Sequence, residues 1–185
     1  MKTTLFLLIL TFTTAAAQVK NFTLTDVTSG STVSLDQFSG RPGVVVIFTS
    51  NDCPFDNYYT DRIGRLVTDY AGKIPFLLVN AHLDPQEAEA NMKKEAAAWS
   101  FRAPYLSDKD QQAMEALSAR RSPEVFLLKP GTGGFQVFYS GALDDNPQDA
   151  SAVTVQYLRD AMENLLAGKP SLAPVRAAGC TIRKK

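Results

Sequence analysis

Cys53 is the residue of this 185-residue chain whose surroundings most favour chemistry. It follows an unbroken apolar run, 44–48, which is typical of a strand buried on both faces of a parallel sheet. It precedes Pro54, a residue that suits the first position of a helix. We therefore expect Cys53 between a central strand and a helix amino terminus, where backbone N–H groups and the helix dipole stabilise a thiolate. The polar neighbours 49–52 argue against a dry, inert thiol.

Cys180 is the second cysteine, and it lies in a tail, 171–185, that has no helical periodicity. A bridge to Cys53 would close a loop spanning most of the chain and would stabilise the fold by roughly 4–5 kcal/mol on the chain-entropy model. Two interpretations stay open. The pair is either a redox couple, in which a flexible tail brings Cys180 back as the resolving cysteine, or a permanent structural bridge.

Two further side chains bear on the chemistry of Cys53. Asp56 lies one helical turn further on and would oppose a thiolate by like-charge repulsion, against the helix dipole. His82 is the only histidine and follows a second apolar run, 74–81. Because parallel strands end at one edge of a sheet, Cys53, His82 and Cys180 form a candidate soft-metal site, of the kind that binds copper(I).

Composition and the amino terminus restrict where the protein works. The formal net charge is zero, and the only basic run is 183–185, so no electrostatic pattern indicates nucleic-acid binding. Residues 1–17 read as a secretory signal peptide, with Lys2, a short apolar core at 5–10 and small residues at 15–17. We expect an exported protein, in the bacterial periplasm or secreted, without a transmembrane segment in the mature chain.

The remaining pattern predicts one α/β domain, 18–170, followed by the tail 171–185 with Cys180. A short amino-terminal hairpin is expected at 21–24 and 32–35, and the strand–helix–strand order makes the strand at 74–81 parallel to the strand at 44–48. The other expected strands are 105–106, 125–128 and 135–139, and the expected helices are 54–71, 86–99, 109–119 and 151–167.

Four short motifs stand in a fixed order along this pattern. They are Asn51-Asp52-Cys53-Pro54, Ser122-Pro123-Glu124-Val125-Phe126, Asp144-Asp145-Asn146 and Gly179-Cys180-Thr181-Ile182-Arg183. In these motifs the chain resembles exported bacterial thioredoxin-like or redoxin proteins, which are related to the alkyl hydroperoxide reductase/thiol-specific antioxidant group. The resemblance implies a thioredoxin-like α/β fold, with a central mixed β-sheet flanked by helices and an amino-terminal β-hairpin. It also implies a cis peptide bond at Pro123, beside the active cysteine.

Departures from related families narrow the activity. A dithiol thioredoxin has Cys-x-x-Cys, whereas the fourth residue of this motif is Asp56, so no disulfide forms within it. Peroxiredoxins carry a proline and a threonine where this chain has Val46 and Ser50, and an arginine where it has Pro123. These differences weigh against a peroxidase.

The sequence therefore favours a thiol–disulfide oxidoreductase that acts through Cys53, with Cys180 as a resolving cysteine and Pro123 beside the site. Pro54, Asp56 and Ser50 would support it. Its partner would be a protein thiol or disulfide, or a small oxidant, and no cofactor is expected. The alternatives are a peroxide reductase, a metal-binding or interaction module without enzymatic activity, and a structural bridge without turnover.

Overall fold

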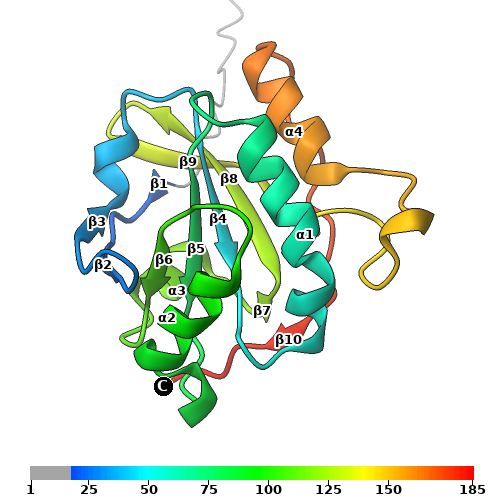
Figure 1. The fold of residues 1–185 in the computed structure, drawn as a ribbon. Helices are drawn as coiled ribbons and strands as arrows, with labels where there is room; N and C mark the ends of the chain where they lie inside the picture. Colours follow the sequence, from blue (N-terminus) through cyan, green and yellow to red (C-terminus); the bar gives the residue numbers. More distant parts are fainter. Residues whose placement is uncertain (1–17) are drawn as a thin grey trace, which may run out of the picture.

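The computed structural model describes residues 18–185, and the predicted signal peptide lies outside the described residues. Within them an eight-stranded mixed sheet has the strand order β1-β9-β8-β4-β5-β6-β2-β3 (Figure 1). β4 and β5 are parallel, as are β5 and β6, whereas β8 runs antiparallel to β4. The predicted class, a thioredoxin-like α/β fold with a mixed sheet flanked by helices, is confirmed.

The bounds of the elements are as follows. The strands are β1 Gln18–Val19, β2 Thr23–Asp26, β3 Thr32–Ser34, β4 Val44–Phe48, β5 Phe76–Asn80, β6 Tyr105–Ser107, β7 Arg121–Ser122, β8 Glu124–Gly131, β9 Gly134–Gly141 and β10 Cys180–Thr181. The helices are α1 Pro54–Asp69, α2 Glu89–Ala98, α3 Gln112–Leu117 and α4 Tyr157–Leu166, with 3-10 turns at Leu35–Phe38, Pro85–Glu87 and Ala150–Ala152.

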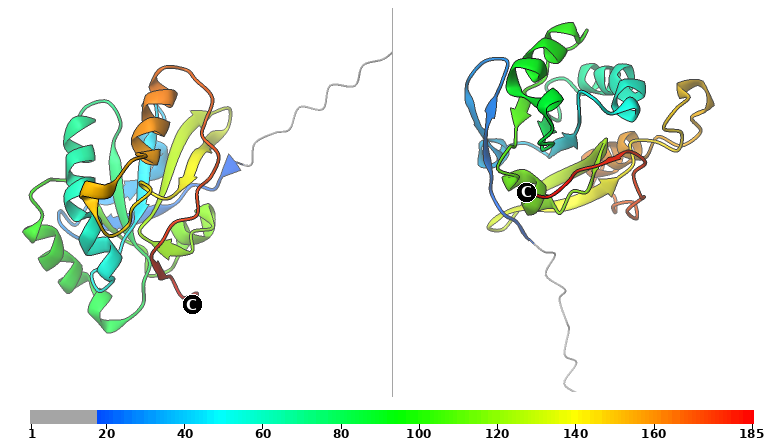
Figure 2. Two further views of the ribbon diagram at one scale, coloured as in Figure 1. Left: turned by 90° about the vertical axis from the view of Figure 1, so that its right-hand side faces the viewer. Right: turned by 90° about the horizontal axis from the view of Figure 1, so that it is seen from below.

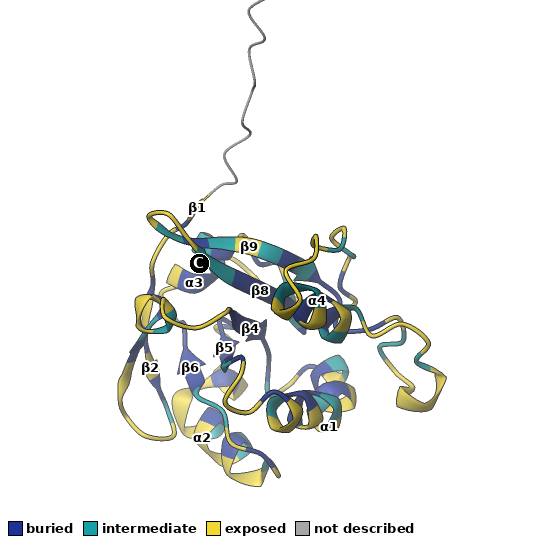
Figure 3. Cartoon of the chain, turned by 90° about the horizontal axis from the view of Figure 1, so that it is seen from above, coloured by how far each residue is buried: buried dark blue, intermediate teal, exposed yellow. Residues whose placement is uncertain are grey.

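β4 lies at the centre of the sheet and is fully buried. Its side chains alternate between the two faces, as strand geometry requires. Val44, Val46 and Phe48 join the core under α3, and Val45 and Ile47 join the core under α1, α2 and α4. A strand with core on both faces needs an unbroken apolar sequence, which is why this stretch shows no alternation. The deepest burial follows β4, β5 and β8 (Figure 3).

Two helices begin later than the sequence predicted, and a carboxylate bonds to the backbone near the amino terminus of each. Asp145 accepts hydrogen bonds from the backbone N–H and the hydroxyl of Thr154, so α4 begins at Tyr157. Val155, which falls inside the predicted helix 151–167, lies ahead of α4 and is exposed. The carboxylate of Asp108 accepts from the N–H groups of Ala113 and Met114, and α3 begins only at Gln112.

The tail is the main departure from the predicted organisation. After α4 it runs back over the molecule toward the carboxyl end of β4 (Figure 2). Val175 is bonded to the end of β9 through the backbones of Ser140 and Ala142, and β10 pairs antiparallel with β7. Ile182 is buried in the core under α3. The tail is thus paired and packed against the domain at several points, whereas one of the two sequence-based interpretations had it as a flexible segment.

Candidate functional site

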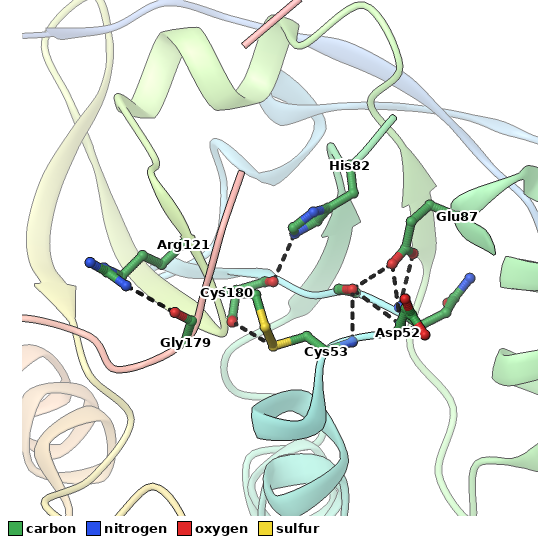
Figure 4. The surroundings of a disulfide bond; sticks show 10 residues. Asp52, Cys53, His82, Glu87, Arg121, Gly179 and Cys180 are labelled. Carbon is green, nitrogen blue, oxygen red and sulfur yellow. Dashed lines mark hydrogen bonds between the residues drawn. A yellow bond between two sulfur atoms is a disulfide. The ribbon is translucent and has the colours of Figure 1, made fainter. Parts of the chain in front are cut away.

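The two cysteines are joined by a disulfide at the carboxyl end of β4 (Figure 4). Cys53 is the residue before α1, and Cys180 begins β10, with their Cα atoms 6.0 Å apart. Their exposure differs. Cys53 is 2% exposed, whereas Cys180 is half-buried. The bond therefore has a sheltered side, set in the helix amino terminus, and a side nearer solvent.

The Ser122–Pro123 peptide bond is cis and lies against this disulfide. Its geometry places the carbonyl oxygen of Ser122 3.4 Å from Sγ of Cys53. Gly179 packs on the same peptide so closely that a Cβ there would lie 2.2 Å from the Ser122 oxygen. The glycine beside Cys180 is therefore required by close approach of the tail to Ser122 and Pro123.

A buried carboxylate organises the loop that holds Cys53. Glu87 accepts hydrogen bonds from the Ser50 hydroxyl at 2.5 Å, the Asn51 and Asp52 N–H groups at 2.9 and 3.2 Å, and the Asn80 amide at 2.6 Å. Ser50 in turn accepts from the N–H of Cys53 at 3.1 Å. Burial alone would raise the pKa of Glu87, but these hydrogen bonds outweigh it and hold the pKa below its usual value. The loop is thus built around a charged Glu87.

His82 lies on the other side of the disulfide pocket and is only 7% exposed. Its Nε2 is 2.8 Å from the hydroxyl of Ser122, and the ammonium of Lys109 donates to its carbonyl oxygen. Burial lowers the pKa of His82, against the opposing charges of Glu87 and Asp84. The neutral imidazole is therefore favoured, hydrogen-bonded to the residue before the cis proline.

Asp56 is buried one turn into α1. Burial raises the pKa of its carboxyl well above the usual range, although the nearby hydroxyls of Thr49 and Ser122 act in the opposite direction. Neither carboxyl oxygen has a hydrogen-bond partner within residues 18–185. Because burial favours the uncharged acid, the predicted repulsion of a Cys53 thiolate is weakened at the pH where Asp56 stays protonated.

A pocket of about 270 Å³ opens at the disulfide and is lined by both cysteines and by His82. Acidic side chains, Asp52 and Asp84, line one side of it, and Arg183 lines the tail side. Pro54 is exposed at the first position of α1, next to this opening. An external thiol entering the pocket would therefore meet the disulfide, and not only a protein surface.

The residues suggested for copper do not form a metal site in this structure. Both sulfur atoms are bonded to each other, so neither offers a thiolate. Across residues 18–185, no group of three or more His, Cys, Asp or Glu side chains is placed to hold a metal ion. Among residues 18–185, no helix has the length and apolarity needed to span a membrane.

Comparison with known families agrees with this arrangement. The Redoxin family matches residues 14–155, most of the chain, and the protein therefore belongs to the Redoxin family. The match ends before the tail, so the family pattern covers Cys53 and Pro123 but not Cys180. No curated protein sequence matches the chain.

Two solved structures match more than nine-tenths of this chain. A hypothetical protein from Sinorhizobium meliloti is 29% identical, with a TM-score of 0.81, and the match covers 93% of this chain and 95% of that one. An uncharacterized conserved protein from Geobacillus kaustophilus is equally similar, with 29% identity, a TM-score of 0.81 and 92% coverage of both chains. A secreted Mycobacterium tuberculosis disulfide oxidoreductase shares the fold, at 18% identity and a TM-score of 0.54, over 80% of this chain and 95% of that one.

Sequence reasoning missed Glu87. This residue stands in a polar stretch that was expected to begin a helix, and nothing in its neighbours marks it as buried. The one available signal was its position shortly after a buried strand, at the edge where Cys53 also lies. His82 lines the same pocket as Cys53, at the sheet edge where the sequence put both, and it is buried against Ser122.

Proposed function

We propose that this protein is a thiol–disulfide oxidoreductase whose redox group is the Cys53–Cys180 disulfide. The observation that carries the proposal is the position of that bond, which lines an open pocket beside the cis peptide of Pro123. A bond made only for stability has no need of a pocket or of a helix amino terminus beneath one sulfur. Membership of the Redoxin family supports the same class of chemistry.

The unequal exposure of the two sulfurs sets the order of steps. A substrate thiolate attacks Sγ of Cys180, the S–S bond breaks, and Cys53 leaves as a thiolate that the α1 amino terminus stabilises. A second substrate thiol then attacks the substrate sulfur of the mixed disulfide and expels Cys180. The substrate loses two electrons as a disulfide, and both cysteines become thiols after taking up two protons. The reverse sequence reduces a substrate disulfide.

This order gives Cys180 a larger part than a resolving residue, because it carries the mixed disulfide. Cys53 is the leaving group in this order, and in the reverse sequence its thiolate resolves the mixed disulfide on Cys180. Ser50 has its hydroxyl committed to Glu87 and positions the Cys53 loop, so it does not offer that hydrogen to a peroxide. For this reason we favour thiol exchange over peroxide reduction.

Export is part of the proposal. A lasting disulfide suits an oxidising compartment, and residues 1–17 carry a signal-peptide pattern. Fractionation of a bacterial host that expresses the full chain tests it. We expect the shortened protein in the periplasm or the medium, and recovery of the uncleaved chain in the cytoplasm would contradict export.

The direct test is trapping with an activated disulfide peptide. We expect Cys53→Ser, which leaves Cys180, to form a mixed disulfide at least about tenfold faster than Cys180→Ser, which leaves sheltered Cys53. Equal trapping would overturn the order of steps. A native bridge that resists dithiols until the protein unfolds would overturn the oxidoreductase and establish a structural bridge. Consumption of hydrogen peroxide with a thiol reductant would favour the peroxidase instead.

A further inference from the structure

A groove of about 850 Å³ lies between α3, β7 and the tail, next to the disulfide pocket. Its wall includes buried apolar side chains, Ala119, Ala177 and Ile182. Thr181 lines both this groove and the disulfide pocket, so the two openings adjoin at the residue after Cys180. A chain segment lying in the groove would therefore reach the more exposed sulfur first.

The groove is bordered by four cations, Arg120, Arg121, Arg176 and Lys184. Within the part of the chain that the structure describes, none of them forms an ion pair. Arg121 donates to the carbonyl oxygen of Gly179, and no side-chain hydrogen bond fixes the other three. Their charges are therefore available to a ligand.

Two acids line the same groove, and they do not cancel this charge. Glu124 accepts hydrogen bonds from the N–H groups of Arg120 and Arg121, which commits one of its oxygens to the backbone. Glu115 is exposed on α3. The groove therefore has an excess of two positive charges, whereas Asp52, Asp84 and Glu87 line the disulfide pocket together with Arg183.

We infer that the groove binds an acidic segment of the protein substrate, adjacent to the cysteines that exchange with Cys180. The inference rests on the proposed oxidoreductase function and specifies its substrate class. Charge complementarity favours acidic residues in the groove, and the apolar wall gives a segment of protein chain surface to bury. The acids at Asp52 and Asp84 repel the same segment, so it is held on the tail side of the bond.

The test uses three dithiol peptides that differ only in four flanking residues, which are Glu, Gln or Lys. We expect the oxidised protein to convert the Glu peptide to its disulfide about tenfold faster than the Lys peptide at low salt, with the Gln peptide between them. The difference should shrink at high salt, because exposed charges are screened. Equal rates for all three peptides overturn the inference and leave the oxidoreductase intact, whereas failure to oxidise any of them overturns the oxidoreductase.

A matched pair of variants separates the groove from the overall charge. Arg120→Gln/Arg176→Gln/Lys184→Gln removes three charges that make no side-chain hydrogen bond within residues 18–185 and leaves the groove with one net negative charge, so we expect the Glu peptide then to react no faster than the Gln peptide. The control, Lys20→Gln/Lys73→Gln/Lys169→Gln, removes three exposed charges outside the groove. It should keep the preference for the Glu peptide. Loss of the preference in both variants would overturn the groove as its source.

Discussion

The two halves of the disulfide are held in very different ways. Cys53 is set in a buried loop whose N–H groups point at Glu87 and Ser50, and it is followed by a helix of 16 residues. Cys180 stands in a strand of two residues that pairs only with β7. Cys53 thus belongs to the core, whereas Cys180 belongs to the tail, 171–185, which lies over the core. Reduction of the disulfide can therefore change the position of the tail while the loop that holds Cys53 keeps its structure.

Removing the covalent bond is the strongest way to test this contrast. We expect Cys180→Ser to lower the free energy of unfolding by about 4 kcal/mol, because the bond closes a loop of 127 residues in the unfolded chain. Denaturant titration without reductant measures the loss. Reductant should destabilise the wild type equally and leave the variant unchanged.

Hydrogen exchange on Cys180→Ser shows whether the tail stays in place without the disulfide. The Ile182 N–H donates to the carbonyl of Arg120, and its side chain is buried, so we expect this amide to remain protected. Fast exchange throughout 171–185 would mean that the bond alone holds the tail.

Removing the Glu87 carboxylate tests how the loop holds the Cys53 half of the disulfide. We expect Glu87→Ala to cost about 3 kcal/mol, because four donors lose a buried charged acceptor. Thermal unfolding measures the cost. Glu89→Ala, an exposed acid two residues further on, is the control and should stay within about 0.5 kcal/mol of wild type. Similar losses in both would contradict an organising role for Glu87.

Adding a methyl group at Gly179 tests the close approach of the tail to Ser122, which holds the Cys180 half of the disulfide. We expect Gly179→Ala to cost about 2 kcal/mol and to speed reduction of the disulfide, since the new Cβ would collide with the Ser122 carbonyl. Gly40→Ala is the matched control, because its Cβ meets no atom within 4 Å. Reduction of Gly179→Ala by dithiothreitol at the wild-type rate would show that the close approach is dispensable.

The smallest expected effect is on the pH dependence of stability, to which Asp56 and Glu87 contribute in opposite directions. The pKa of Asp56 is raised in the folded state, so its contribution to stability is present at low pH and is lost as pH rises through the folded value. The pKa of Glu87 is lowered, so its contribution is present at neutral pH and is lost as pH falls below the usual glutamate range.

Asp56→Asn therefore isolates one of these opposing contributions. We expect the variant to lose less stability than wild type as the pH rises above the usual aspartate range, measured by denaturant titration at each pH, while the loss at acid pH from Glu87 persists. Parallel stability curves for the two proteins would contradict a raised pKa for Asp56.

The contacts of its side chains explain the motif Asp144-Asp145-Asn146. Asp144 accepts hydrogen bonds from the Tyr59 hydroxyl and the Arg62 guanidinium, which ties the turn after β9 to α1. Asp145 fixes Thr154, and Asn146 accepts from the two N–H groups that follow Pro147. These contacts tie the turn to α1 and to Thr154, so we assign its residues a structural role.

The fold class and the position of Cys53 could be predicted from the sequence, because the order of the strands and helices and the four motifs are local features. An apolar run long enough for a buried strand, followed by Pro54 and apolar residues at helical spacing, predicts a strand and then a helix with Cys53 between them. It also indicated Pro123, whose cis bond the structure contains. Only the tertiary structure decided where the tail lies, that Cys180 is bonded to Cys53, and that Glu87 and Asp56 are buried. Those features depend on contacts between residues far apart in the chain, and no local spacing records them.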